Sequence, residues 1–150
     1  MQRTDFVHFY ELPVRWGDLD ALGHVNNVQL ISYLECGRVA YCDKVLGLQF
    51  TPALKQGWIL ADIQCTFHQQ LQFPCSIEVA TRISRLGTSS AELVAAIFKR
   101  GSDGLILSSH AVTVWFDYEI QAGTPIPATV RSSIKRFEKT APDESVSSRK

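Results

Sequence analysis

The feature that most constrains this chain is a polar turn that runs directly into a long helical pattern. An apolar pattern extends from Val28 to Leu46, and the turn before it is Asp18-Leu19-Asp20-Ala21-Leu22-Gly23-His24-Val25-Asn26-Asn27. The first turn of a helix leaves backbone N–H groups without intrahelical acceptors, and the helix dipole makes that end positive. The sequence therefore places two carboxylates, one imidazole and two carboxamides beside a site that attracts negative charge.

The helical pattern has a wide apolar arc. Polar residues recur every three positions, and the residues between them are largely apolar: Leu30, Ile31, Leu34, Val39, Tyr41 and Val45. An arc of this width favours a helix that is covered on most sides. Asn26 or Asn27 is a good N-cap, and Gly47 after Lys44 is a good C-terminal stop.

Strand patterns surround this helix. Alternating residues predict one strand over residues 6–16 and four more over 59–68, 77–84, 91–100 and 105–117. Short turns between consecutive strands imply antiparallel neighbours, and Pro13 belongs at a bulge or on an unpaired edge. We therefore expect an α+β domain over residues 1–137, in which an antiparallel sheet curls around one central helix. Residues 129–137 suggest a short terminal helix, and the polar residues 138–150 predict a flexible, solvated tail.

Composition excludes several classes of function. Fifteen Lys+Arg balance fifteen Asp+Glu, so no overall charge attracts the chain to nucleic acid or to an anionic membrane. No signal peptide and no apolar run near ~20 residues is present, so the cytoplasm is the expected compartment. The cysteines, Cys36, Cys42, Cys65 and Cys75, have no metal-binding spacing, and we interpret them as buried free thiols. We expect no metal site, and no phosphate-binding or dinucleotide fingerprint is found.

The turn and helix resemble those of a known family. The segment from Asp18 to Asn27, followed by a helix with Glu35 and Arg38, resembles the hotdog-fold acyl-CoA thioesterases, in the 4-hydroxybenzoyl-CoA thioesterase-like branch. Plant acyl-carrier-protein thioesterases carry a similar segment. The resemblance implies a five-stranded antiparallel sheet wrapped around one long central helix. It also implies a homodimer, often paired again into a homotetramer, with active sites at the subunit interface.

The resemblance assigns the catalytic groups. It implies that Asp20 is the catalytic carboxylate, as nucleophile or as general base, and that the backbone N–H of Asn27 polarises the thioester carbonyl. His24 lies where the plant enzymes place a catalytic histidine. The rest of the plant pattern is not matched. Leu22 stands where the plant enzymes have an asparagine, and the position of their acidic residue falls near Gln69 or Gln70, which are not acidic.

Other residues of the turn have structural explanations. We expect Asp18 to hydrogen-bond backbone groups within the turn. Asp20 has an alternative interpretation, as a residue that only stabilises the turn. Gly23 is expected to supply a positive φ or a close approach to substrate, and Asn26 to cap the helix.

Coenzyme A carries phosphates, so a cationic or N–H-rich surface has to meet it. The candidates for binding it are Arg85 with the turn residues Gly87, Ser89 and Ser90, and Lys99 with Arg100 at a strand end. No cofactor is expected, because coenzyme A is part of the substrate.

The expected function is hydrolysis of an acyl-CoA thioester to a free carboxylic acid and coenzyme A. One alternative is a 2-enoyl-CoA hydratase or dehydratase on the same fold, using an Asp20/His24 couple. Another is a non-catalytic acyl-CoA-binding module. The sequence leaves open the acyl group, the choice between coenzyme A and a carrier protein, and dimer versus tetramer. Pocket depth depends on side chains such as Tyr33, Trp58, Leu60 and Phe67.

Overall fold

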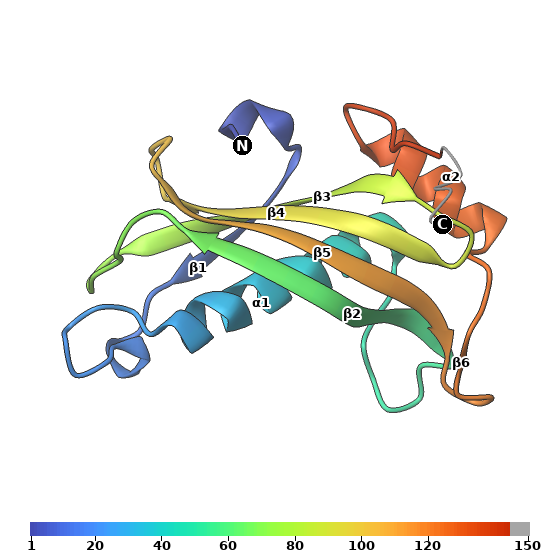
Figure 1. The fold of residues 1–150 in the computed structure, drawn as a ribbon, viewed down its shortest axis with the longest axis horizontal. Coiled ribbons are helices and arrows are strands. Elements are labelled where there is room, and N and C mark those ends of the chain that lie inside the picture. The colour runs from blue at the N-terminus through green and yellow to red at the C-terminus, as the bar shows by residue number, and fades with distance from the viewer. Residues whose placement is uncertain (145–150) are drawn as a thin grey trace.

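The computed structural model describes residues 1–144, which form one sheet curved around one long helix (Figure 1). The strands run in the order β1-β3-β4-β5-β2, every neighbouring pair is antiparallel, and a short β6 pairs with the end of β5. The elements are η1 (Arg3–Asp5), β1 (His8–Pro13), η2 (Trp16–Asp18), α1 (Asn27–Leu46), β2 (Gln56–Phe67), β3 (Ser76–Leu86), β4 (Ser90–Lys99), β5 (Leu105–Asp117), β6 (Ala122–Gly123) and α2 (Ala128–Phe137). The predicted α+β arrangement is confirmed, and β6 is an addition to the five expected strands.

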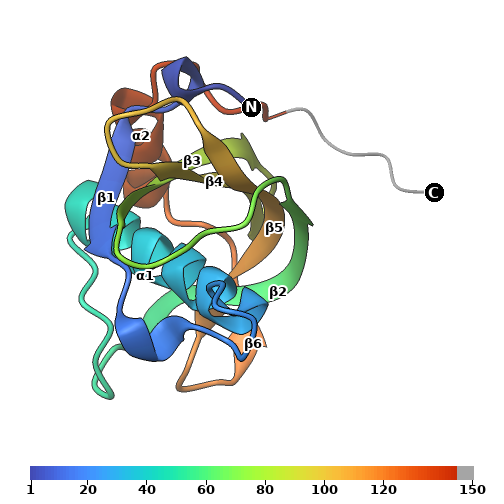
Figure 2. The same ribbon diagram turned by 90° about the vertical axis from the view of Figure 1, so that its left-hand side faces the viewer.

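Helix α1 lies in the hollow of the sheet, and Figure 2 shows the strands curving around it. It lies close to the sheet at Gly37, where an added Cβ would lie 2.3 Å from Cγ1 of Val79 on β3. The described residues leave part of the opposite face of α1 uncovered, since Val28 is 65% exposed and Ile31 and Val39 are also exposed. The expectation of a helix covered on most sides is therefore not met within residues 1–144, where the sheet covers one face of α1 and α2 also contacts the helix near Tyr41.

Both ends of α1 are as predicted. The Asn26 side chain accepts a hydrogen bond from the backbone N–H of Val28 at 2.9 Å, which makes Asn26 the N-cap. Gly47 ends the helix with φ +64°, and its N–H donates to the carbonyl of Asp43. A positive φ at this position favours glycine, which explains the stop.

Strand β1 is shorter than the predicted strand over residues 6–16. After Pro13 the chain turns, because the backbone N–H of Arg15 donates to the Asp18 carboxylate at 2.9 Å and residues 16–18 form η2. Local side-chain bonding thus overrides the alternating pattern. Pro13 ends an edge strand, as its missing N–H requires.

Within the predicted solvated tail, Glu138 and Asp143 are bonded to the domain, although residues 139–141 are exposed as expected. Glu138 is 8% exposed and accepts hydrogen bonds from the Tyr41 hydroxyl at 2.5 Å and from the Ile83 N–H at 2.9 Å. Asp143 exchanges backbone hydrogen bonds with Ser84 and Leu86, along the part of β3 that β1 does not reach. The domain therefore extends to residue 144, and the remainder of the predicted tail, residues 145–150, lies outside the described residues.

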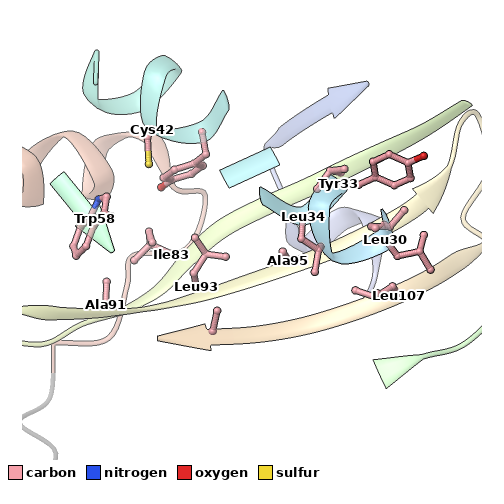
Figure 3. Close-up of a cluster of buried hydrophobic side chains, with 14 of the residues drawn as sticks. Leu30, Tyr33, Leu34, Cys42, Trp58, Ile83, Ala91, Leu93, Ala95 and Leu107 are labelled. Atoms are coloured by element: carbon pink, nitrogen blue, oxygen red, sulfur yellow. The ribbon is translucent and has the colours of Figure 1, made fainter. Parts of the chain in front are cut away.

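The main core lies between α1 and the concave face of the sheet (Figure 3). Leu30, Tyr33 and Leu34 pack at one end of it, and Cys42 and Trp58 lie at the other. The four cysteines are free, but only Cys42 is buried; Cys36 is exposed and the remaining two are half-buried, which corrects the expectation of buried thiols. None of the described helices combines the length and apolar character that a membrane-crossing helix needs.

Candidate active site

A cavity of about 270 Å³ opens beside the start of α1. Its wall is built by the turn before the helix, by the first turns of the helix and by the chain that follows β2. The lining residues are Asp20, Leu22, His24, Val25, Asn27, Leu30, Phe67, His68, Gln69, Gln70 and Leu71. The structure thus brings Asp20, His24 and Asn27 around one space, as the sequence predicted.

Asp20 is held in place by the turn that it helps to form. Its Oδ1 accepts hydrogen bonds from the backbone N–H of Leu22 at 2.8 Å and of His24 at 3.2 Å, and its own N–H donates to the His24 carbonyl at 2.8 Å. Within residues 1–144, no protein group donates to its Oδ2. One oxygen of this carboxylate therefore stabilises the turn, and the other is available to a ligand.

The start of α1 presents an unused donor to the same cavity. The N–H groups of Val28, Gln29 and Leu30 donate to the Asn26 cap residue, through its side chain or its carbonyl. The Asn27 N–H, in contrast, donates to no acceptor among the described residues. An N–H group at a helix N-terminus is suited to an oxyanion, because the helix dipole adds positive charge there.

Asp18 occupies a different environment from Asp20. It is 2% exposed, its carboxylate forms an ion pair with the Arg15 guanidinium at 2.7 Å, and it also accepts a hydrogen bond from the Tyr33 hydroxyl. The Arg15 side chain is the largest cause that lowers the pKa of Asp18 to about 2; Tyr33 adds to it, and burial opposes it. Burial and the hydrogen bond to Asp18 raise the pKa of Tyr33, so its hydroxyl stays protonated and donates.

The sequence predicts only part of this cluster. The backbone bond expected for Asp18 exists, to the N–H of Arg15, but the roles of the Arg15 and Tyr33 side chains were missed. A tyrosine on the buried face of a helix needs a partner for its hydroxyl, and that requirement was an available signal.

The two histidines of the cavity wall differ in their contacts. No hydrogen bond joins the His24 imidazole to the Asp20 carboxylate in the described chain; the only link between them runs through backbone groups and Oδ1. The Nε2 of His68 lies 2.8 Å from the Ser108 hydroxyl on β5. The Asp20/His24 couple of the hydratase alternative is therefore not formed in this structure.

Gly23 and Asn26 support the turn and do not line the cavity. Gly23 has φ +78°, which meets one of the two expectations for it, and its N–H donates to the Asp20 carbonyl at 3.1 Å. Asn26 caps the helix, and its N–H donates to the Asp18 carbonyl at 2.9 Å. Both residues thus shape the backbone that carries Asp20 and Asn27.

The predicted phosphate-binding residues Arg85, Gly87, Ser89 and Ser90 do not meet this cavity within one chain. Phe67 at the cavity is paired with Leu107 on β5, which is paired in turn with Ile97 on β4. Ser90 begins β4 and lies seven residues from Ile97, a distance of roughly 23 Å at about 3.3 Å per residue.

Several groups of this distant turn are engaged internally. Arg85 forms an ion pair with Glu92 at 3.1 Å, the Gly87 N–H donates to the Ser90 carbonyl, and the Gly87 carbonyl accepts from Arg131. At the other end of β4, which is the end nearer the cavity, lie Lys99 and Arg100; Arg100 pairs with Glu11 at 3.0 Å.

The chain after β2 is the part of the wall that the sequence indicated least. The sequence marks Gln69 and Gln70 only as replacements for an acidic residue, but both line the cavity together with Leu71. A backbone hydrogen bond from Val25 to the Leu71 carbonyl, 2.8 Å long, ties this segment to the turn. Within residues 1–144, no group of three or more His, Cys, Asp or Glu residues is placed to hold a metal ion.

Comparisons with known proteins agree with this architecture. The model of the thioesterase-like superfamily matches residues 14–134. The chain is 31% identical over 133 residues to the chloroplastic acyl-acyl carrier protein thioesterase ATL2 of Arabidopsis thaliana, a match that covers 87% of this chain and 70% of that protein.

The chain is also similar to solved structures of other proteins. The PA2801 protein of Pseudomonas aeruginosa is 32% identical with a TM-score of 0.79, over 86% of this chain and 98% of that one. The gentisyl-coenzyme A thioesterase BH1999 is 27% identical with a TM-score of 0.72, over 82% of this chain and 98% of that one.

Proposed function

This chain belongs to the thioesterase-like superfamily and is a thioester hydrolase with the hotdog fold, and we propose that its substrate is an acyl-coenzyme A. The reaction releases a free carboxylic acid and the coenzyme A thiol. The proposal rests on one observation above all. A half-buried carboxylate and a helix N–H line the same cavity, and neither the second carboxylate oxygen nor the N–H has a partner among residues 1–144.

Asp20 and Asn27 divide the chemistry between them. Oδ2 of Asp20 either attacks the thioester carbonyl carbon, forming an anhydride that water then cleaves, or removes a proton from a water that attacks the same carbon. The Asn27 N–H donates to the carbonyl oxygen as its negative charge develops, and one such donor is typically worth about 2.7–4 kcal/mol in the transition state. On both routes the C–S bond breaks when the tetrahedral intermediate collapses, which on the first route is the step that produces the anhydride. The departing sulfur leaves as the thiol after gaining a proton.

The wall of the cavity suggests what kind of acyl group fits. Leu22, Val25, Leu30, Phe67 and Leu71 are apolar, and no lysine or arginine among residues 1–144 lines the space. Burying a charge without a partner is costly, so an uncharged acyl group suits this lining. The proposed reaction requires no cofactor or metal.

We further propose that the working form is a homo-oligomer. The exposed apolar face of α1 and the edge strand β2, where Leu60 and Phe67 are exposed, are surfaces that a second copy would cover. The turn at residues 87–90, which is distant from the cavity in its own chain, would reach substrate only from a neighbouring chain. Light scattering of the purified protein is expected to give the mass of a dimer or a larger assembly.

The test of function is thiol release from a panel of aliphatic and aromatic acyl-CoAs, with acyl carrier protein thioesters alongside, by wild type and Asp20→Asn. Asparagine keeps an oxygen that accepts the Leu22 N–H, so the turn is retained, but it removes the charge and the free carboxylate oxygen. We expect kcat to fall by about 10²–10⁴-fold while KM and the midpoint of urea unfolding stay near the wild-type values.

Asp103→Asn is the matched control, because Asp103 is an exposed aspartate between β4 and β5, and we expect it to leave the rate unchanged. Full activity of Asp20→Asn would show that Asp20 is only a turn former. A product that has gained water and still carries coenzyme A, seen by mass spectrometry, would favour the hydratase instead.

A further inference from the structure

A buried residue, Asp18, anchors the start of the turn that carries Asp20. The Asp18 carbonyl accepts the N–H of the helix cap Asn26 at 2.9 Å, and its carboxylate accepts the Tyr33 hydroxyl from the body of α1. Asp18 therefore joins the first residue of the turn to both the start and the interior of the helix. Asp20 follows two residues later and Asn27 one residue after the cap, so both reacting groups are attached close to this anchor.

The anchor is made rigid by complete pairing of its carboxylate. Arg15 donates to it from Nε at 3.1 Å, from Nη2 at 2.7 Å and from its backbone N–H at 2.9 Å, in addition to the donation from Tyr33. A planar guanidinium that binds a carboxylate through two nitrogens fixes orientation as well as distance. Asp18 is 2% exposed and Tyr33 is 5% exposed, so water does not readily replace the hydrogen bond between these two side chains.

We propose that Asp18, held by Arg15 and Tyr33, is a positioning residue that sets the separation between the Asp20 carboxylate and the Asn27 N–H. It does not touch substrate: within residues 1–144, neither Asp18 nor its two partners lines the cavity. Its contribution is made through backbone geometry. This inference rests on the proposed roles of Asp20 and Asn27, and it concerns how accurately these groups are placed.

Helix α1 offers a matched control for the role of Tyr33. Tyr41, eight residues later, is also buried and also donates its hydroxyl to a buried carboxylate, that of Glu138. Tyr33→Phe and Tyr41→Phe therefore remove the same chemical group from the same helix, the first at the anchor of the turn and the second beside α2. A purely structural role predicts similar effects of the two substitutions on activity.

The experiment measures kcat and KM for thiol release, with the acyl-CoA that wild type cleaves fastest, at a temperature where circular dichroism shows each variant folded. We expect Tyr33→Phe to lower kcat by about ten- to a hundredfold with KM within about threefold, because small misplacements of reacting groups have effects of that size. Tyr41→Phe is expected to keep kcat within about twofold of wild type. Equal kcat values for the two variants would overturn the proposal.

A second variant keeps the test decisive if Tyr33→Phe does not fold. Arg15 has a side chain that is 71% exposed, so Arg15→Gln removes the guanidinium without opening the core, and kcat is expected to fall as well. Unchanged kcat in Arg15→Gln would equally overturn the proposal. Measuring Asp20→Asn in the same assay separates the positioning role from the proposed function. If Asp20→Asn is inactive while Tyr33→Phe is fully active, only the positioning role of Asp18 fails. If Asp20→Asn is active, the proposed function fails.

Discussion

Replacing Gly37 by alanine tests how tightly α1 is seated on the sheet. The added Cβ would lie 2.3 Å from Cγ1 and 2.9 Å from Cβ of Val79, and 3.2 Å from Oγ1 of Thr81. Rotating the Val79 side chain would move Cγ1 but not its Cβ. Val79 and Thr81 are fully buried on β3, a strand that is paired on both sides, so the helix has to move away from the sheet.

The expected cost follows from two opposing effects. Overpacking a well-packed core typically costs about 1–3 kcal/mol, and contacts below 3 Å with a fixed strand belong at the upper end of that range. Alanine regains about 1 kcal/mol over glycine in a helix interior. Gly37→Ala is therefore expected to lower the free energy of unfolding by about 2 kcal/mol, which corresponds to roughly 4–8 °C in Tm for a domain of this size.

Urea denaturation followed by circular dichroism measures this difference. Gly17→Ala is the control, because an added Cβ there has no atom within 4 Å, and its stability is expected to stay within about 0.5 kcal/mol of wild type. The double variant Gly37→Ala/Val79→Ala removes Cγ1 and is expected to lose less than the sum of the single losses. If Gly37→Ala is as stable as wild type, the contact between α1 and β3 is softer than the geometry implies.

Two further predictions concern buried polar groups. Burial, with a smaller effect of Lys44, lowers the pKa of His8 from 6.5 to about 4, so the unfolded chain binds more protons between these values. Stability is then complete above pH 6.5 and falls by about 3 kcal/mol as the pH drops to 4, and His8→Phe should flatten this dependence in urea titrations across that range. Glu138→Ala leaves the Tyr41 hydroxyl and the Ile83 N–H without their acceptor and is expected to cost about 3 kcal/mol in the same measurement, whereas Glu138→Gln keeps an acceptor and should cost less. A pH-independent stability in the first case, or equal losses for the two variants in the second, would contradict the reasoning.

Local signals in the sequence predicted the fold and the turn well. The start of α1 at its Asn26 cap, its stop at Gly47 and the positive φ of Gly23 each depend on residues within a few positions of each other. Antiparallel neighbours followed from the short turns between strands. These features are set by backbone conformation and by adjacent side chains, so a single sequence contains the information needed.

Long-range contacts are where prediction failed. The polar residues 138–144 have no periodicity, and nothing near Glu138 indicates that Tyr41 and Ile83, far away in the sequence, donate to it. The strand prediction ran past Pro13 because alternation continues through Arg15, while the capping bond to Asp18 bends the chain. The segment with Gln69 and Gln70 reaches the cavity only because the sheet curls and the Leu71 carbonyl accepts the Val25 N–H.

The two oxygens of Asp20 have different roles, because Oδ1 holds the turn and Oδ2 faces the reaction, and this limits how the enzyme can be redesigned. A glutamate in its place would have a side chain one methylene longer, which no longer matches the spacing of the Leu22 and His24 amides. The reactive oxygen would extend further into the cavity, but the turn that positions it would lose its hydrogen bonds. Anyone who wishes to retarget this hydrolase is therefore better advised to alter the opposite wall, at Phe67 and Gln70, and to leave the loop intact.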